Sequence, residues 1–248
     1  MSIGAYIVVA LFGAMVGSFI NVVTLRLNTG RSIFTGRSVC DSCGKELSWF
    51  HLVPVFSFLS LRGRCGMCGS KIGFDHFIAE IVMAALFVFA FYMHALSPLL
   101  ILTLPFLALV VGIVLYDLRH TVIPNVFVYP LIILSFGVAV LSEAQEATFI
   151  AAFSMSALFG FIWLLSKGRA MGFGDAKLVL ALALFVGYPL SLTGFILSFW
   201  IGAVISVFLL VISGKRRTMN HEVPFAPYLA IGFLCAYLLQ INLFPILF

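Results

Sequence analysis

Charged side chains are scarce in this sequence. Asp, Glu, Lys and Arg make up 9% of its 248 residues, whereas hydrophobic residues make up 63% and the mean hydropathy is +1.20. Because a soluble globular domain carries roughly 25% charged residues, this composition excludes an ordinary soluble protein. Tandem repeats, low-complexity tracts and a glycine-rich nucleotide fingerprint are also absent from the sequence, which argues against a repeat array and a nucleotide-binding fold.

Long apolar segments occupy most of the chain instead. Many approach about 20 residues, the length that a helix needs to cross a hydrocarbon core of about 30 Å. The sequence therefore predicts an all-α polytopic membrane protein with about eight transmembrane helices. We expect these helices near residues 3–25, 77–95, 98–116, 123–141, 147–165, 176–190, 191–213 and 226–247. The first segment lacks the basic start of a cleavable signal, so we interpret it as a retained span.

Basic residues fall on one side of this predicted topology. Cytoplasmic loops of membrane proteins carry an excess of Lys and Arg, so this side is predicted to be cytoplasmic and both termini external. The net charge of +5 then reflects topology and contact with membrane lipid, and does not indicate nucleic-acid binding. The opposite face carries only Glu143 and Glu146. The 14 basic residues are Arg26, Arg31, Arg37, Lys45, Arg62, Arg64, Lys71, Arg119, Lys167, Arg169, Lys177, Lys215, Arg216 and Arg217.

Cysteine is rare as well, since the chain has only five. Four of them form the motifs CDSC (40–43) and CGMC (65–68), inside the only long polar stretch, residues 28–76. Two C-x-x-C motifs supply four soft thiolates, which predicts a structural Zn²⁺ site without an open coordination position. The alternative is two disulfides, which a reducing cytoplasmic location disfavours. The predicted ligands are Cys40, Cys43, Cys65 and Cys68.

Two aspartates stand at the predicted cytoplasmic edge of the membrane. Asp117 follows the third apolar segment, and Asp175 opens the sixth. Two neighbouring carboxylates share one proton and together activate a water for attack on a peptide carbonyl, so we predict a catalytic pair. Gly172 and Gly174 are expected to let a substrate strand approach closely. The structural alternative is that Asp175 caps a helix N-terminus and that Asp117 is an interfacial residue.

Several separate motifs occur in an order that resembles one known family. They are GSFINVVTLRL (17–27), RSVCDSCGKELSWFHLVPVFSFLSLRGRCGMCG (37–69), YDLRHTVIPN (116–125), MGFGDAKL (171–178) and PFAPYLAIG (224–232). Together they cover nearly the whole chain and resemble the type IV prepilin leader peptidases. In these motifs Asp117 and Asp175 match the family's catalytic aspartates, and the four cysteines match the thiols of its bifunctional members.

The resemblance implies a membrane aspartic endopeptidase that removes the leader of prepilins and pilin-like proteins. It places this activity at the cytoplasmic face of a bacterial inner membrane, and it implies N-methylation of the new terminus with S-adenosylmethionine as donor. The expected division is a first span (1–27), a zinc-binding, methyltransferase-associated cytoplasmic insertion (28–76) and a transmembrane peptidase core (77–248).

One stretch departs from the family pattern. The sequence IGFDHFIAE (72–80) stands where the family usually reads like IS-x-RYPLVE. Asp75, His76 and Phe77 replace the usual Arg, Tyr and Pro, whereas Glu80 is retained. The resemblance implies that Glu80 belongs to the methyl-transfer region and binds the cofactor.

Other functions compete with this interpretation. A leader peptidase without methyltransferase activity has the same aspartates, and a presenilin-like intramembrane aspartic protease also carries YD and G-x-G-D motifs. A proton-coupled transporter would use the aspartates as a relay, but it predicts ionisable residues near mid-span. A zinc-stabilised scaffold leaves the glycine–aspartate motif unexplained.

Overall fold

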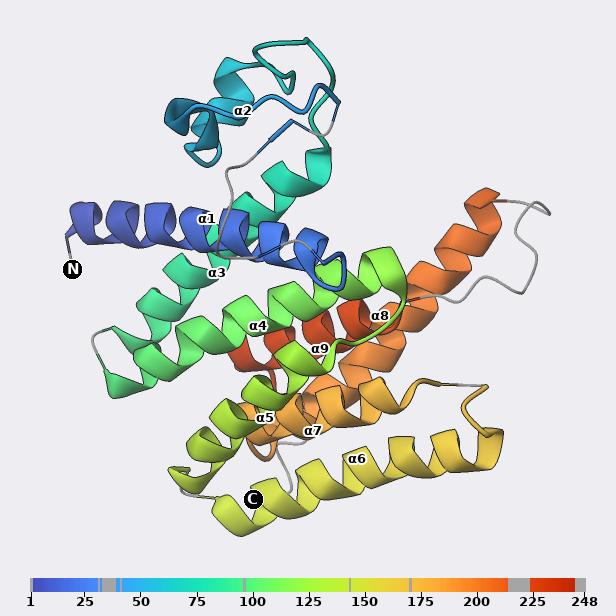
Figure 1. Cartoon of the computed structure of the whole chain (residues 1–248). Coiled ribbons are helices and arrows are strands. Elements are labelled where there is room, and N and C mark those ends of the chain that lie inside the picture. The colour runs from blue at the N-terminus through green and yellow to red at the C-terminus, as the bar shows by residue number, and fades with distance from the viewer. Residues whose placement is uncertain are drawn as a thin grey trace. The chain divides into compact units, whose positions relative to one another are not determined.

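The computed structural model describes residues 2–30, 32, 39–40, 42–95, 97–142, 144–169, 171–213 and 224–243. Within these ranges the chain is helical, and its only extended pairings are the isolated bridges Val39–Glu46 and Arg64–Lys71. It divides into two compact units, residues 1–112 and 113–248 (Figure 1). Six charged residues of the topology argument lie outside the described residues: Arg31, Arg37, Glu143, Lys215, Arg216 and Arg217.

A helix occupies each of the eight predicted apolar segments. The long helices are α1 (Ile3–Arg26), α3 (Phe74–His94), α4 (Pro98–His120), α5 (Asn125–Val140), α6 (Gln145–Ser166), α7 (Phe173–Val186), α8 (Leu190–Ser213) and α9 (Ala226–Leu238). The polar insertion adds η1 (Trp49–Leu52) and α2 (Phe56–Ser60).

Four of the predicted helix ranges miss an end by three residues or more. The helix α3 begins at Phe74 rather than at residue 77, and α4 ends at His120 rather than at residue 116. The sixth range, 176–190, corresponds to α7, which begins three residues earlier and ends at Val186 because Gly187 has a left-handed φ of +77° and Tyr188–Pro189 follows it. Residues 187–189 of the stretch GYPL therefore separate α7 from α8, which begins at Leu190. The last range, 226–247, begins as α9, but this helix ends at Leu238, since Gln240 leaves it with a φ of +52°.

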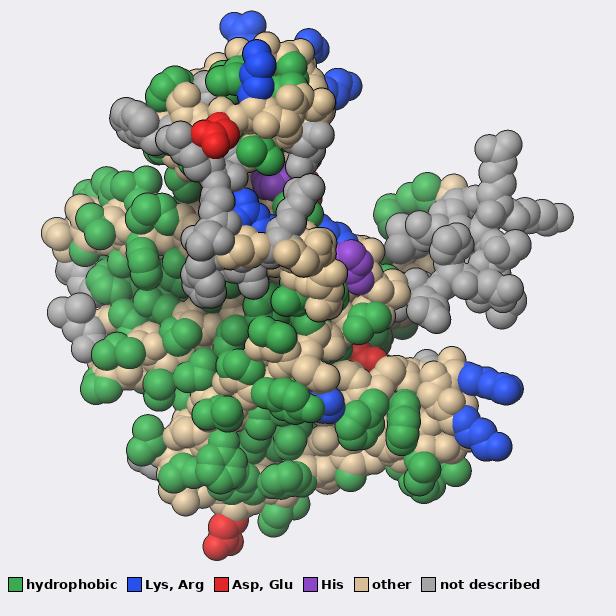
Figure 2. All heavy atoms as spheres, in the orientation of Figure 1, with side chains coloured by type: hydrophobic (Ala, Val, Ile, Leu, Met, Phe, Trp, Pro, Cys, Tyr) green, Lys and Arg blue, Asp and Glu red, His purple; other side chains and the backbone are tan. Residues whose placement is uncertain are grey.

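Among the residues that the structure describes, five helices are long and apolar enough to cross a membrane: α1, α3, α4, α6 and the Leu190–Phe208 part of α8. Their exposed faces are rich in large apolar side chains, which Figure 2 shows in green. The chain is therefore a multi-pass membrane protein. The helices α5, α7 and α9 have 16, 14 and 13 residues, so at about 1.5 Å per residue they fall short of a hydrocarbon core of about 30 Å. The number of eight crossings stays a prediction.

In the first unit, α1 packs against α3 at very short range. A Cβ atom on Gly13 would lie 2.9 Å from Ala84 Cα, and one on Gly17 would lie 2.7 Å from the carbonyl oxygen of Ala79. Small residues four apart permit this close approach between helices in lipid. The contact fixes the polar ends of α1 and α3 beside each other.

In the second unit, α7 is the central helix. It packs against α5, α6, α8 and α9, and its residues from Ala181 to Val186 are all buried. A helix that is apolar on every side needs such an environment. Ser156 of α6 donates a hydrogen bond to the carbonyl of Ala176 (2.9 Å), which ties the start of α7 to its neighbour. The surrounding helices thus fix the position of Asp175.

Candidate functional site

Asp117 lies inside α4, one turn before the helix ends at His120. The predicted segment ended at residue 116, so the helix is longer than expected. The Asp117 side chain is only 4% exposed, and its Oδ2 accepts a hydrogen bond from the backbone N–H of Ala226 at 3.1 Å. Ala226 is the first residue of α9, whose N-terminus carries the positive end of the helix dipole. Asp117 therefore binds the start of α9.

Asp175 is the third residue of α7, and Gly172 occupies the N-cap position. The interpretation of Asp175 as an N-cap is therefore wrong. Its backbone N–H donates to the carbonyl of Gly172 (3.2 Å), and its half-buried carboxylate lies close enough to Asp117 for the two to repel each other electrostatically. The second unit thus brings together two aspartates that are 58 residues apart in sequence.

The two glycines beside Asp175 have different surroundings. A Cβ atom on Gly172 would meet no side chain but that of Asp175, at 3.5 Å from its Oδ2, so the backbone next to the carboxylate is accessible. A Cβ atom on Gly174 would lie 2.9 Å from Ile123 Cβ. Gly174 therefore lets α7 pack against the loop that follows α4. This packing explains why the position is a glycine without any role in substrate binding.

Lys177 is a further residue of this region that sequence analysis did not connect to the site. Its ammonium donates to Asn125 Oδ1 (3.0 Å) and to the Tyr129 hydroxyl (3.3 Å). It also lies 5.0 Å from the centre of the Tyr129 ring and 5.3 Å from that of Phe173, within the range of a cation–π contact. Lys177 thus links α7 to α5 two residues after Asp175. In the sequence, the only indication of this role is that Lys177 stands two residues after Asp175.

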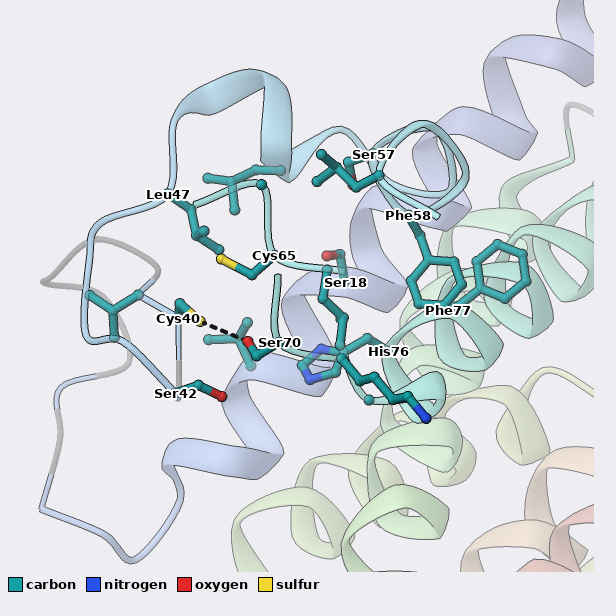
Figure 3. Close-up of a pocket in the computed structure, with 18 of the residues that line it drawn as sticks. Ser18, Cys40, Ser42, Leu47, Ser57, Phe58, Cys65, Ser70, His76 and Phe77 are labelled. Atoms are coloured by element: carbon teal, nitrogen blue, oxygen red, sulfur yellow. Dashed lines mark hydrogen bonds between the residues drawn. The ribbon is translucent and has the colours of Figure 1, made fainter. Parts of the chain in front are cut away.

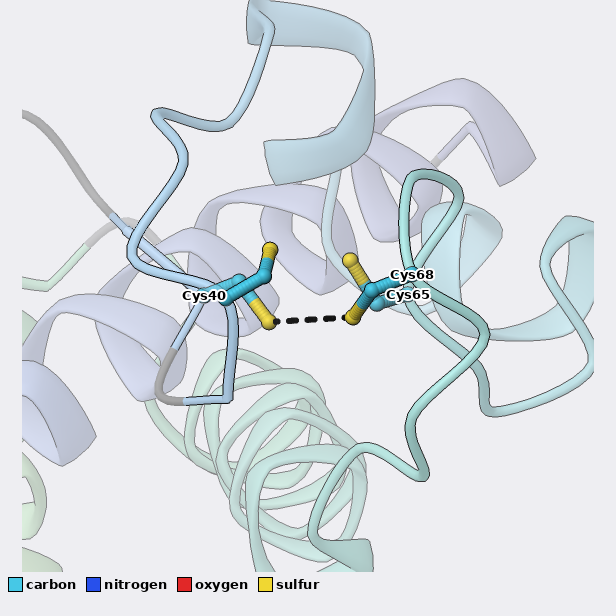
Figure 4. A group of neighbouring side chains, drawn as sticks. Cys40, Cys65 and Cys68 are labelled. Carbon is cyan, nitrogen blue, oxygen red and sulfur yellow. Dashed lines mark hydrogen bonds between the residues drawn. The ribbon is translucent and has the colours of Figure 1, made fainter.

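The four predicted cysteines converge in the first unit (Figure 4). They belong to the segment 39–73, here called the cysteine lobe, and their sulfur atoms all lie within 4.8 Å of one another. Tetrahedral zinc with bonds of about 2.3 Å would hold neighbouring sulfurs roughly 3.8 Å apart, and the sulfurs of Cys40 and Cys68 are 3.8 Å apart. The four thiols are thus positioned to bind a metal ion, and both their chemistry and their spacing fit zinc.

The two C-x-x-C motifs have the same backbone turn. The N–H of Cys40 donates to the carbonyl of Lys45 and that of Cys65 to the carbonyl of Ser70, at 3.0 and 2.8 Å. In each turn a glycine with φ near +70° then returns an N–H to the first cysteine, and these glycines are Gly44 and Gly69. Glycine adopts that conformation without strain, so the sequence builds two matching ligand pairs.

Hydrogen bonds also favour the thiolate form of Cys40 and Cys68. The N–H groups of Cys43 and Ser42, with the Ser70 hydroxyl, hydrogen-bond to the Cys40 sulfur and lower the pKa of this thiol to about 6. The hydroxyl and the N–H of Ser70 likewise lower the pKa of the Cys68 thiol. Because the thiolate is the form that binds metal, both residues suit the predicted role.

A cavity of about 470 Å³ lies in the first unit, between the cysteine lobe and the helices α1 and α3 (Figure 3). Glu80 lines it and is 8% exposed. Its Oε2 accepts the N–H of Val55 at 2.7 Å, so Glu80 also anchors the lobe to α3. His76 lines the cavity as well, and its Nδ1 lies 2.7 Å from Nδ2 of Asn21, which is fully buried. The structure therefore places two of the departing residues, His76 and Phe77, at a pocket together with the retained Glu80.

Known proteins resemble the chain along most of its length. The sequence profile of the Type IV leader peptidase family matches residues 101–207, and that of the bacterial peptidase A24 N-terminal domain matches residues 11–94. No solved structure matches the chain.

Three similar proteins bear the name prepilin leader peptidase/N-methyltransferase. The protein of Bacillus subtilis (strain 168) is 30% identical over 233 residues, covering 92% of each chain. That of Pseudomonas aeruginosa is 30% identical over 258 residues, covering 90% of this chain and 86% of its own. That of Vibrio cholerae is 32% identical over 200 residues, covering 73% and 77%. With these matches to both halves of the sequence, the chain belongs to the type IV leader peptidase family.

Proposed function

We propose that this protein cleaves the leader from type IV prepilins and pilin-like proteins, with Asp117 and Asp175 as its catalytic residues. The observation that supports the proposal is that the Asp175 carboxylate, from α7, lies within electrostatic range of the Asp117 carboxylate, from α4. Peptide hydrolysis by paired aspartates needs no further side-chain nucleophile, because the pair activates water directly.

The surroundings of the two aspartates suggest a division of roles. The N–H of Ala226, at the start of α9, donates a hydrogen bond to the Asp117 carboxylate and so fixes its orientation. Asp117 would then take a proton from the attacking water. Asp175 would hold the proton that the pair shares and donate it to the carbonyl oxygen of the scissile peptide. The accessible backbone at Gly172 would let an extended substrate approach Asp175.

A second activity, N-methylation of the newly formed terminus, is proposed from the names of the relatives. When bound, S-adenosylmethionine would supply the methyl group for the new terminal amine, with S-adenosylhomocysteine and a proton as the other products. The four cysteines would hold Zn²⁺ in a structural role, because four thiolates leave no position for catalysis.

The proposed location is the bacterial inner membrane, with the cysteine lobe and both aspartates on the cytoplasmic side. Arg62 and Arg64 are exposed on the lobe together with Lys45 and Lys71, and Figure 2 shows basic side chains gathered there. This agrees with the preference of basic loops for the cytoplasm. A cysteine accessibility assay on intact cells and on inverted vesicles tests the sidedness.

Mass spectrometry of the pilin N-terminus tests both activities at once. A prepilin would be co-expressed with the wild type, Asp117→Asn or Asp175→Asn. We expect a pilin without its leader only with the wild type. The mass of this product should exceed that of the unmethylated cleaved pilin by one methylene. Normal cleavage by either variant would remove the aspartate pair from the mechanism, whereas a shortened but unmethylated product would leave a peptidase alone.

A further inference from the structure

We infer that one side of the cysteine lobe rests on the phospholipid bilayer, with the exposed apolar side chains of η1 and α2 inserted among the lipid headgroups. This side is called the apolar face, and it consists of Phe50, Leu52, Val53, Phe56 and Leu59. All of these residues belong to the first unit. The placement depends on the membrane class of the chain and on neither of the proposed activities.

The apolar face is unusually exposed for part of a small lobe. Phe50 is 53% exposed, Phe56 is 62% exposed and Leu59 is 59% exposed. Phe58 lies between the last two in sequence but packs inward, against Phe74 and Phe77 of α3, with ring centres 5.8 and 4.6 Å away. One side of α2 therefore holds the lobe on α3, and the other side presents large apolar groups. Proteins in water rarely expose such groups together, so a contiguous patch marks a contact with a partner or a membrane.

The contact with α3 shows how deep this part of the lobe lies. Glu80, which accepts the N–H of Val55 at 2.7 Å, is the seventh residue of α3. Val55 therefore lies beside a point roughly 9 Å from the start of that helix. Because α3 has 21 residues, its length of about 32 Å barely exceeds a hydrocarbon core of about 30 Å. The segment between η1 and α2 is thus level with the membrane interface.

The contact with α1 gives the same depth. Leu52 and Phe58 of the lobe share the wall of the cavity with Ser18 and Val22 of α1. Ser18 stands eight residues before the end of α1 at Arg26, which is about 12 Å along the helix axis. Both α1 and α3 are long and apolar enough to cross a membrane, so the lobe lies alongside their ends. Its outer side therefore meets lipid.

The charges of the lobe suit anionic headgroups. Arg62 and Arg64 follow α2 directly, and both are exposed. Figure 2 shows the basic side chains of the lobe toward its upper end, away from α1 (Figure 1). Residues 47–74 contain no Asp or Glu, so nothing in this stretch repels an anionic lipid. Apolar side chains at the acyl boundary with Lys and Arg at the level of the phosphates are typical of segments that lie in a membrane interface.

Photo-crosslinking of the full-length protein in lipid nanodiscs tests the contact. The photoreactive residue p-benzoylphenylalanine replaces Phe56 in one preparation and Phe50 in another, so that either can report if the other fails to fold. The matched control places it at Lys45, which is also exposed on the lobe. The discs contain phosphatidylcholine and phosphatidylglycerol, and mass spectrometry identifies what has been crosslinked. Thermal unfolding and zinc content are compared with those of the wild type.

We expect a phospholipid adduct at positions 56 and 50, and about tenfold less of it at position 45, because apolar side chains of an interfacial segment reach below the headgroups whereas a lysine stays in water. Discs of phosphatidylcholine alone should give roughly fivefold less adduct at position 56, since basic residues near the surface are attracted to anionic lipid. The double variant Arg62→Gln, Arg64→Gln should reduce this difference between the two kinds of disc.

Other results would overturn the contact with lipid. A crosslink to a second copy, or to another segment of the same chain, would mean that protein covers the apolar face. An intact fold without any adduct at positions 56 and 50 would leave this face in water. Equal lipid adducts at positions 45 and 56 would mean that the apolar face has no preference for the bilayer. Equal yields in the two kinds of disc would overturn the role of the arginines. None of these measurements uses prepilin cleavage, so a failure of the proposed function leaves them unchanged.

Discussion

Asp117 has two tasks in this protein, and two substitutions separate them. Its carboxylate is proposed to act on water, and it also accepts the N–H of Ala226 at the start of α9. Asp117→Asn keeps a side-chain oxygen that can accept this N–H but carries no charge. Asp117→Ala removes both the acceptor and the charge. We expect both variants to lose prepilin cleavage, but only the alanine variant to lose the contact with α9.

The size of the difference follows from the burial of the contact. Asp117 is 4% exposed and Ala226 is fully buried, so the alanine variant leaves an N–H group without a partner, at a cost of about 1–3 kcal/mol. The asparagine variant loses only the attraction between a charge and a helix N-terminus, typically about 0.3–1 kcal/mol. The free energy of unfolding should therefore fall by roughly 1–3 kcal/mol in Asp117→Ala and by about 1 kcal/mol or less in Asp117→Asn.

The assay combines cleavage of a prepilin in detergent with thermal unfolding of the same preparations. Asp175→Asn is the matched control, since no hydrogen bond from its carboxylate to another helix is described; it should abolish cleavage with little change in stability. Prepilin cleavage by Asp117→Asn at the wild-type rate would refute the catalytic role. Equal stability of the alanine and asparagine variants would refute the role in holding α9.

Three other predictions concern the packing, the metal and Lys177. Gly17→Ala should lower the free energy of unfolding by about 1–3 kcal/mol, because its Cβ would lie 2.7 Å from a backbone oxygen of α3. Gly160→Ala is the control and should not lower it, since a Cβ at that position has no atom within 4 Å. Thermal unfolding compares the two variants. Removing metal with a chelator, or the substitution Cys68→Ser, should abolish methylation while cleavage persists, because metal binding supplies the folding energy of a small lobe. Mass spectrometry of the pilin measures both activities. Equal loss of both would instead mean that the lobe positions the whole enzyme. Lys177→Met should destabilise the protein by about 1 kcal/mol, since the ammonium no longer holds Asn125 and Tyr129. A melting temperature unchanged from that of the wild type would show that this link between α5 and α7 contributes nothing.

Apolar periodicity and length located the helices well but not all of their ends. The range 226–247 is apolar except for a few residues such as Gln240 and Asn242, yet α9 stops at Leu238. Hydropathy cannot register that termination, because it depends on the backbone conformation: Gln240 has a φ of +52° and the N–H of Ile241 donates back to the carbonyl of Ala236. The predicted start of α7 is wrong as well, since Gly172 rather than Asp175 takes the N-cap position.

Composition and short motifs were enough to predict the membrane class, the family and the four cysteines that the structure brings together. The chemistry of motifs such as the two C-x-x-C turns is local, and their glycines set the turn conformation. The folded structure was needed to find that Asp117 holds the N-terminus of α9, that Lys177 joins α7 to α5, and that His76 and Glu80 line one cavity with the cysteine lobe. Each of these depends on contacts between residues far apart in the chain, and packing of the helices, rather than any local pattern, brings those residues together.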